Sequence, residues 1–167
     1  EQPHYTVLHR EGALELRRYA PRLAAETVVR GDEVSARNKG FQAIAGFIFG
    51  GNQGKASIAM TAPVMQSGDG KDWTVRFIMP QGSTLETLPK PNNPKVQLRA
   101  MPPSRMAVVR FSGLVGQDAV DAKTLALTQF VKAQKLQATG APSLAQYNPP
   151  WTLWFMRRNE IWLALPD

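Results

Sequence analysis

Residues 40–64 read GFQAIAGFIFGGNQGKASIAMTAPV and combine several structural signals in one short stretch. Apolar residues recur at helical spacing up to Phe49, and two glycines and an asparagine at 50–52 can adopt the positive φ that ends a helix. A short apolar run follows at 57–60 and leads into the tetrapeptide MTAP at 60–63. This order predicts an amphipathic helix, a glycine-rich stop and a short strand.

Three further segments extend the pattern over nearly the whole chain: LELRRY at 14–19, QYNPP at 146–150 and RRNEIWL at 157–163. Together with residues 40–64 they resemble the SOUL heme-binding protein family, in which a helix with a glycine–asparagine stop precedes a K-I-x-M-T-x-P-V strand. The resemblance implies an α+β fold and binding of heme or another tetrapyrrole. Function is argued separately below, because a fold does not dictate the site that it carries.

Composition predicts one compact domain over residues 1–167, which are 43% hydrophobic. No apolar run approaches the roughly 18 residues that span a membrane. The chain has no cysteine, which excludes disulfides and thiolate ligands. It begins Glu1-Gln2-Pro3 without a methionine, which favours a removed leader and a periplasmic or secreted protein. A trimmed cytoplasmic protein is the alternative.

The net charge of +7 does not indicate nucleic-acid binding. Basic residues are scattered, no run reaches four, and no helix carries a basic stripe interleaved with aromatic residues. We therefore expect no nucleic-acid partner. Such a surface would still attract heme propionates, anionic lipid or acidic proteins.

The sequence repeats itself with a period of about 82 residues. Residues 14–25 align with 96–107, and the parallel continues in two further pairs of segments, 58–64 with 145–151 and 77–80 with 163–166. The repeat predicts a duplicated β-β-α-β-β unit, with copies at about 12–80 and 95–166 related by a pseudo-two-fold axis. The loop 81–94 joins the copies.

The periodicity predicts two helices, at 33–49 and 117–136, with Asp32 as the N-cap of the first. It also predicts eight strands, at 12–19, 23–29, 57–60, 73–79, 95–101, 106–111, 151–156 and 160–165. The expected fold class is α+β, with a distorted, mostly antiparallel, barrel-like sheet of eight strands.

Two glycines inside the first helix, Gly40 and Gly46, each cost about 1 kcal/mol relative to alanine. Their presence indicates that something packs close to the helix backbone. The sheet is the favoured interpretation, and a flat ligand is the alternative.

Catalytic constellations are missing from the sequence. The two histidines, His4 and His9, do not form a metal-binding pair, and no H-E-x-x-H, phosphate loop or G-x-S-x-G is present. Asp118 and Asp121 lie in the first turn of the second helix, where carboxylates offset the helix dipole. We therefore expect no catalytic residue, no metal site and no enzymatic activity.

Heme binding requires an apolar slot, basic groups for two propionates and, in many proteins, an axial ligand. The resemblance places the slot between the first helix and the C-terminal strands. Its expected walls are Phe41, Ile44, Ala45 and Ile48 on the helix, with Trp151, Leu153 and Trp154 opposite.

This chain departs from the family at the basic positions, which fall here near Gly46 and Thr152. Arg37 and Lys39, one turn earlier, are the expected substitutes for holding propionates. The family's proposed axial histidine has no counterpart, so any bound heme would be weakly ligated or unligated by protein.

The segment Arg157-Arg158-Asn159-Glu160 has two interpretations. The two arginines suit carboxylates or an acidic partner. The favoured interpretation is a hairpin turn with Asn159 at positive φ.

The sequence thus predicts a SOUL-type carrier or scavenger for a tetrapyrrole or another flat hydrophobic anion. Two alternatives stay open. One is an effector-binding module for small amphipathic ligands, because bacterial gyrase-inhibitor-type domains share the duplicated architecture. The other is a protein-interaction domain whose groove accepts a partner helix.

Overall fold

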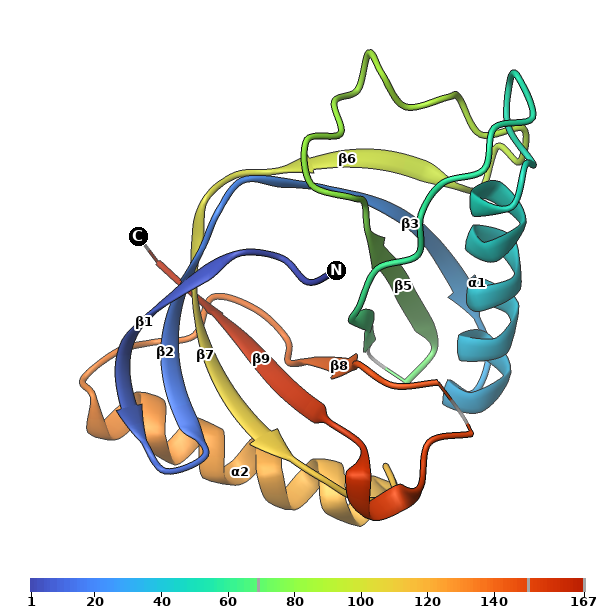
Figure 1. Ribbon diagram of the computed structural model, residues 1–167. Helices are drawn as coiled ribbons and strands as arrows, with labels where there is room; N and C mark the ends of the chain where they lie inside the picture. Colours follow the sequence, from blue (N-terminus) through green and yellow to red (C-terminus); the bar gives the residue numbers. More distant parts are fainter. Residues whose placement is uncertain (69, 150, 167) are drawn as a thin grey trace. The chain divides into compact units, whose positions relative to one another are not determined.

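The computed structural model of the chain describes residues 1–68, 70–149 and 151–166 (Figure 1). The chain divides into two compact units. Unit 1 comprises Glu1–Pro3 and Pro21–Pro102, and unit 2 comprises His4–Ala20 and Pro103–Asp167. Each unit contains one α-helix and a run of antiparallel strands. The predicted α+β class with two helices is confirmed, with nine strands among the described residues where eight were expected.

Unit 1 places the helix α1 against the strands β3 and β5 (Figure 1). Its sheet has the order β4-β5-β3-β6. Its elements are β3 (Arg22–Arg30), α1 (Glu33–Ile48), β4 (Val64–Gly68), β5 (Asp72–Ile78) and β6 (Gln97–Met101). The buried core between helix and sheet consists of Ala25, Ile44, Phe47, Ile48, Ile58, Val75, Phe77, Met79 and Val96.

The helix α1 begins where the sequence predicts. The Asp32 carboxylate accepts a hydrogen bond from the backbone N–H of Ser35 at 2.9 Å, which caps the helix. A Cβ on Gly40 would lie 2.5 Å from Val75 Cγ2, so glycine is required for the close packing of helix on sheet. The sheet is therefore what approaches the helix at Gly40. Gly46 is exposed, with nothing within 4 Å of its Cβ position.

Unit 2 places the helix α2 across β7 and β9 (Figure 1). Its sheet has the order β1-β2-β7-β9-β8. Its elements are β1 (Tyr5–Glu11), β2 (Leu14–Tyr19), β7 (Ser104–Phe111), α2 (Gln117–Ala133), β8 (Ser143–Gln146), the 3-10 helix η1 (Trp154–Met156) and β9 (Asn159–Leu165). The core under α2 consists of Ala107, Val109, Phe111, Leu127, Phe130, Val131, Leu144, Ile161, Leu163 and Leu165.

The strands within unit 1 and the strands within unit 2 pair in the same register. In unit 2 Arg17 pairs with Met106, and in unit 1 Arg99 pairs with Ala24. The shift from 17 to 99 equals the shift from 24 to 106, which is the period read from the sequence. The first strand of each predicted copy, however, lies in the compact unit of the other copy: β2 belongs to unit 2 and β6 to unit 1.

Two predicted strands are wrong. Residues 57–60 are irregular, and the strand follows later as β4. The reason is that the backbone N–H of Ile58 bonds to Ile48 O at the end of α1, and the Thr61 hydroxyl bonds to Ile78 O. Both bonds fasten this segment outside the sheet ladder, ahead of a cis Ala62–Pro63 peptide bond.

Residues 151–156 form a turn and the helix η1, and β8 lies earlier in the chain than the predicted strand. The predicted hairpin turn at 157–160 is also wrong. Asn159 is buried and begins β9, and among the described non-glycine residues positive φ occurs at Lys55 and Lys135. Lys135 at φ 58° ends the second helix at Ala133, three residues before the predicted position.

The predicted apolar face of α1 is correct only in part. Ile44 and Ile48 are buried, but Phe41 is 42% exposed. The buried face runs instead through Ala36, Gly40, Ile44, Phe47 and Ile48. In the described part of the chain no helix has the length and apolar character to cross a membrane.

Candidate functional site

The face of the unit 2 sheet opposite α2 carries charged and aromatic side chains. Leu14 and Leu16 pack toward the α2 core, so the alternate residues of β2 point to the other face. The same alternation in β9 places Ile161 in the core and its neighbours on the opposite face. Seven residues meet there, which we call the Glu160 network: Glu15, Arg17, Tyr19, Tyr147, Arg158, Glu160 and Trp162.

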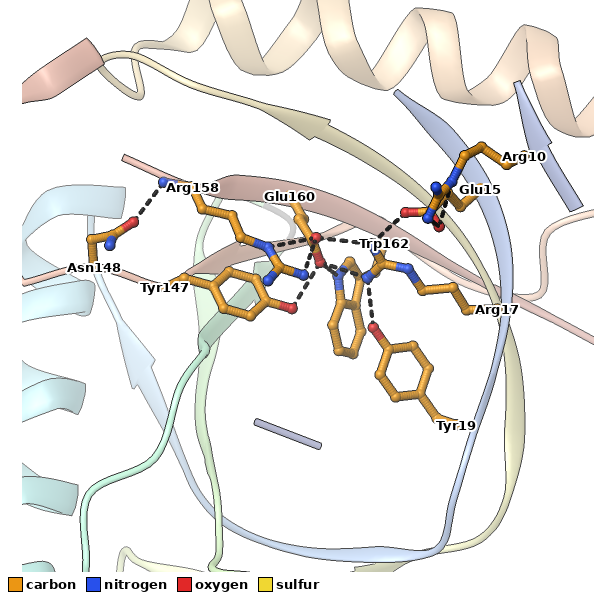
Figure 2. Close-up of polar contacts among 9 residues, drawn as sticks. All are labelled: Arg10, Glu15, Arg17, Tyr19, Tyr147, Asn148, Arg158, Glu160 and Trp162. Atoms are coloured by element: carbon orange, nitrogen blue, oxygen red, sulfur yellow. Dashed lines mark hydrogen bonds and ion pairs between the residues drawn. The ribbon is translucent and has the colours of Figure 1, made fainter. Parts of the chain in front are cut away.

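The Glu160 carboxylate is fully buried and accepts six hydrogen bonds. Arg17 binds it with two nitrogens, Nη1 to Oε1 at 2.8 Å and Nη2 to Oε2 at 3.0 Å. Arg158 Nη2 donates to Oε2 at 2.8 Å. The Tyr147 hydroxyl and Trp162 Nε1 donate to Oε1 at 2.8 and 2.9 Å. Figure 2 shows the two guanidinium groups converging on this carboxylate.

The side chain of Arg17 is 1% exposed and makes further contacts beyond Glu160. Its Nη2 donates to Glu15 Oε1 at 2.8 Å and its Nη1 donates to the Tyr19 hydroxyl at 2.9 Å. Its guanidinium lies 4.1 Å from the ring centroid of Tyr5. Such stacking on an aromatic face suits a buried arginine.

Burial and charge pairing compete in setting the pKa values of this network. Burial acts to raise the pKa of Glu160, but the hydrogen bonds and charge of Arg17 outweigh it and hold the pKa below its ordinary value. The pKa of Glu15 is lowered in the same way by Arg17 and Arg10. Burial, followed by the charge of Glu160, raises the pKa of Tyr147. Both carboxylates are therefore ionised at neutral pH, and their oxygens are already bound by the protein's own cations.

A hollow of about 570 Å³ lies beside the network. It is formed by the β1–β2 turn, the end of β7 and the segment that precedes β9. Four arginines line it, and we call it the arginine-lined hollow. Its lining residues are Arg10, Gly12, Ala13, Glu15, Arg110, Phe111, Ser112, Phe155, Met156, Arg157 and Arg158.

The arginines of this hollow differ in how they are held. Arg10 binds Glu15 and Arg158 binds Glu160, whereas Arg157 Nε donates to the Thr152 carbonyl at 2.8 Å. The exposed side chain of Arg110 has no ion-pair or hydrogen-bond partner among the described residues. Four guanidinium groups face one lining carboxylate, so the hollow is positively charged.

Large apolar side chains stand exposed next to this hollow. The segment 151–156 has five of them: Trp151 at 84% exposure, Leu153 at 57%, Trp154 at 58%, Phe155 at 56% and Met156 at 64%. The Trp154 and Phe155 rings meet edge to face, with centroids 5.5 Å apart. Exposed apolar surface of this density marks a binding region more often than an ordinary surface.

The residues predicted for the heme slot belong to both units. Ile44 and Ile48 are part of the unit 1 core, Ala45 is half-buried, and the Phe41 ring lies 5.4 Å from that of Phe77. These residues belong to unit 1, and Trp151, Leu153 and Trp154 belong to unit 2. The slot between them stays a prediction.

Arg37 and Lys39 have different surroundings. Arg37 donates to Gln66 Oε1 at 2.8 Å and to Glu33 Oε1 at 3.2 Å, on the β4 side of the helix. Lys39 lines a separate hollow beside β3. The two basic groups expected to hold propionates therefore point to different sides of α1.

The arginines of the arginine-lined hollow suit the carboxylates at the edge of a tetrapyrrole. They are not ligands for its iron. Guanidinium groups bind carboxylates with paired hydrogen bonds. His9 stacks on Phe130 and contacts Glu11, and it does not line the hollow. The described residues contain no group of three or more histidine, cysteine or acidic side chains placed to hold a metal. Among the residues that line the hollow, Met156 has a thioether sulfur, which is an axial ligand of heme iron in some proteins.

Sequence reasoning missed the Glu160 network and favoured a turn over a carboxylate site at Arg157 and Arg158. A signal was present: Glu15 and Arg17 alternate with leucines in one strand, and Glu160 directly precedes the apolar run 161–165 in another. Charged residues on the inner face of a strand indicate a buried ion pair.

Comparisons with known proteins agree with this fold. No curated protein sequence matches the chain. Among solved structures, the EcmrR C-terminal domain has a TM-score of 0.69 at 13% identity, covering 98% of both chains. A hydrolase from Listeria innocua has a TM-score of 0.65 at 12% identity, covering 95% of this chain and 94% of that one. SAV2435 bound to tetraphenylphosphonium has a TM-score of 0.51 at 14% identity, covering 92% and 94%.

Identities this low show a shared fold alone. The sequence model of the SOUL heme-binding protein family, in contrast, matches residues 1–164, which is nearly the whole chain. The chain therefore belongs to the SOUL heme-binding protein family.

Proposed function

We propose that the protein binds a tetrapyrrole or another flat hydrophobic anion at the arginine-lined hollow, as a carrier or scavenger without turnover. The observation that carries the proposal is the juxtaposition of four arginines with the exposed aromatic segment 151–156. An anion with a flat apolar body needs both features. Family membership supports a tetrapyrrole as the ligand.

Each part of the hollow has a distinct role in this proposal. Arg110 and Arg157 receive the ligand's carboxylates, while Arg10 and Arg158 stay engaged with Glu15 and Glu160 and add positive potential. Trp154 and Phe155 offer ring faces and edges to the macrocycle. Heme, when bound, supplies its own iron chemistry, and the chain contributes binding and orientation.

Hemin titration followed in the Soret band tests the proposal. We expect a band that saturates at one equivalent. Arg110→Glu should weaken binding at least tenfold, about 1.4 kcal/mol, because it replaces a cation of the hollow by an anion. Trp154→Ala should weaken it similarly. Lys132→Glu is the matched control, because it makes the same charge change on the exposed side of α2.

A broad rise that does not saturate, or equal losses in Arg110→Glu and Lys132→Glu, would show adsorption to a basic surface and would refute the site. A circular dichroism spectrum of each variant separates loss of binding from loss of fold.

The second candidate is an effector-binding module for small amphipathic ligands. It is favoured by the likeness to SAV2435, whose structure holds tetraphenylphosphonium, a lipophilic cation. A lipophilic cation needs a carboxylate whose charge is not already neutralised. In this chain Arg17 and Arg158 already bind both oxygens of Glu160, so we expect such cations to bind weakly. Titration with tetraphenylphosphonium decides between the two: tight, saturable cation binding would favour the effector module over the anion carrier.

A further inference from the structure

Unit 1 contains a second hollow, of about 680 Å³, which runs along the end of β3. We call it the β3-edge hollow. Its lining residues come from β3, the middle of α1 and the start of β6: Glu26, Thr27, Val28, Val29, Arg30, Lys39, Ala43, Lys95 and Gln97. It shares no residue with the arginine-lined hollow.

The hollow lies where a sheet neighbour ends. The strand β3 pairs with β5 up to Arg30, but it pairs with β6 only over Arg22 to Glu26. The last four residues of β3, 27–30, therefore have a neighbouring strand on one side and none on the other within the described parts of the chain. Val28 is 61% exposed there.

Main-chain groups at this open edge point into the hollow. Leu23 O accepts a hydrogen bond from Met79 N, and Gly31 N donates to Lys71 O, both on the β5 side. In an extended strand the main-chain groups of successive residues point to opposite sides. The N–H and C=O groups of Val28 and Arg30 consequently point away from β5, toward the side on which β3 no longer pairs with β6.

The charges around the hollow are mostly positive. Lys39 and Lys95 line it, and neither ammonium group has an ion-pair or hydrogen-bond partner among the described residues, although the Lys95 backbone N–H donates to Asn93 Oδ1. The lining carboxylate, Glu26, is bound by Arg76 at 2.7 Å and by Arg99 at 2.8 Å. Arg30 pairs with Asp72. Two lysines are thus available to an acidic ligand beside an unpaired strand edge.

We propose that residues 27–30 of β3 form a docking site for an extended acidic segment of a partner protein. The segment adds to the sheet as a short strand beside residues 27–30, beyond the end of the β3–β6 pairing. It forms main-chain hydrogen bonds with Val28 and Arg30. Its carboxylates meet Lys39 and Lys95. Folded proteins generally cover or block such edges, because an open edge recruits another strand. The proposal does not depend on the ligand of unit 2.

A fluorescently labelled, acetylated peptide of alternating glutamate and valine is the probe, with binding followed by anisotropy. We expect saturable binding that weakens as salt increases. A matched peptide of alternating lysine and valine should bind at least tenfold more weakly. The double variant Lys39→Ala/Lys95→Ala should lose at least tenfold in affinity for the acidic peptide, whereas Lys132→Ala should keep it.

Two changes test the strand geometry. Val28→Pro removes an N–H that faces the open edge and leaves the β5 pairing intact, so peptide binding should be lost while Val28→Thr keeps it. Methylating the peptide's own backbone nitrogens tests the same point without changing the protein. Because only alternate residues of an added strand bond to β3, methylation at one parity should abolish binding and methylation at the other should not.

Equal binding of the acidic and basic peptides would overturn the proposal. So would equal binding of the two methylated peptides, even if Val28→Pro does not fold. Self-association of the protein that Val28→Pro abolishes, measured by sedimentation, together with no binding of the acidic peptide, would assign the edge to a second copy and would also overturn it.

Discussion

Unit 1 and unit 2 share their strand registers but bury charge to different extents. Arg17 on β2 and Arg99 on β6 occupy matching positions, each paired across to the matching residue of the neighbouring strand. The Arg17 side chain is 1% exposed and that of Arg99 is 59% exposed. Arg17 binds a fully buried carboxylate, Glu160, and Arg99 binds Glu26 at a more open face. The apolar residues under each helix fix the strand register. The residues on the opposite face are not needed for the register, so they can differ between the two units.

The largest effect expected from this difference concerns the two carboxylates. Glu160→Ala should lower the free energy of unfolding by about 3–5 kcal/mol, because it leaves Arg17 buried without its main counter-charge. Glu26 is also buried, but its partners Arg76 and Arg99 are 22% and 59% exposed and keep contact with water, so Glu26→Ala should cost less, about 1–3 kcal/mol. Urea unfolding at neutral pH measures both. Similar losses in the two variants would show that burial does not distinguish these ion pairs.

Acid should destabilise unit 2 through its two buried carboxylates. The pKa values of Glu160 and Glu15 lie below their ordinary value of 4.5 in the folded protein. A lowered pKa stabilises the fold above the ordinary pKa, and that stability is lost as the pH falls below it. We therefore expect the free energy of unfolding to fall on acidification below about pH 4.5. In Glu160→Gln this fall should be smaller. An unchanged acid dependence in that variant would contradict the assignment.

The smallest effects expected concern the two helix starts. Asp32 caps α1 through Ser35, whereas Gly116 at the start of α2 makes no side-chain cap bond. Asp32→Ala should cost about 1 kcal/mol, and Gly116→Asn should gain a few tenths of a kcal/mol. Gly116 has φ −101°, which asparagine adopts without strain. Thermal unfolding of both variants checks the opposite signs. A destabilised Gly116→Asn would show that α2 begins at another residue.

The sequence allowed most of the helical and central-strand positions to be predicted, because their apolar residues recur with a clear period. The strands β3, β5, β6, β7 and β9 lie within two residues of their predicted bounds. The edge strand β1 was missed because almost all of its residues are exposed and show no alternation. The segments 57–60 and 151–156 were misassigned because their apolar composition suggested a strand, while local hydrogen bonds hold them outside the sheet.

The candidate site was less accessible to sequence reasoning. Trp151, Leu153 and Trp154 were identified as ligand residues from their size and apolar character, and they lie exposed beside the arginine-lined hollow. Arg157 and Arg158 were interpreted as part of a turn, and Arg10 and Arg110 were not singled out. Their grouping depends on strands that are distant in sequence, since Arg10, Arg110 and Arg157 meet only after folding. The spacing of these residues along the chain therefore does not predict that they lie together.

The exchange of first strands between the two copies bears on how such a protein could have arisen. A chain with only one copy would lack the strand that completes its own sheet, and its first strand would have no sheet to join. Two such chains could complete each other by exchanging that strand in a domain-swapped dimer, but only at concentrations at which the dimer forms. Joining the copies through residues 81–94 makes the trade intramolecular, so assembly no longer depends on how much protein is present.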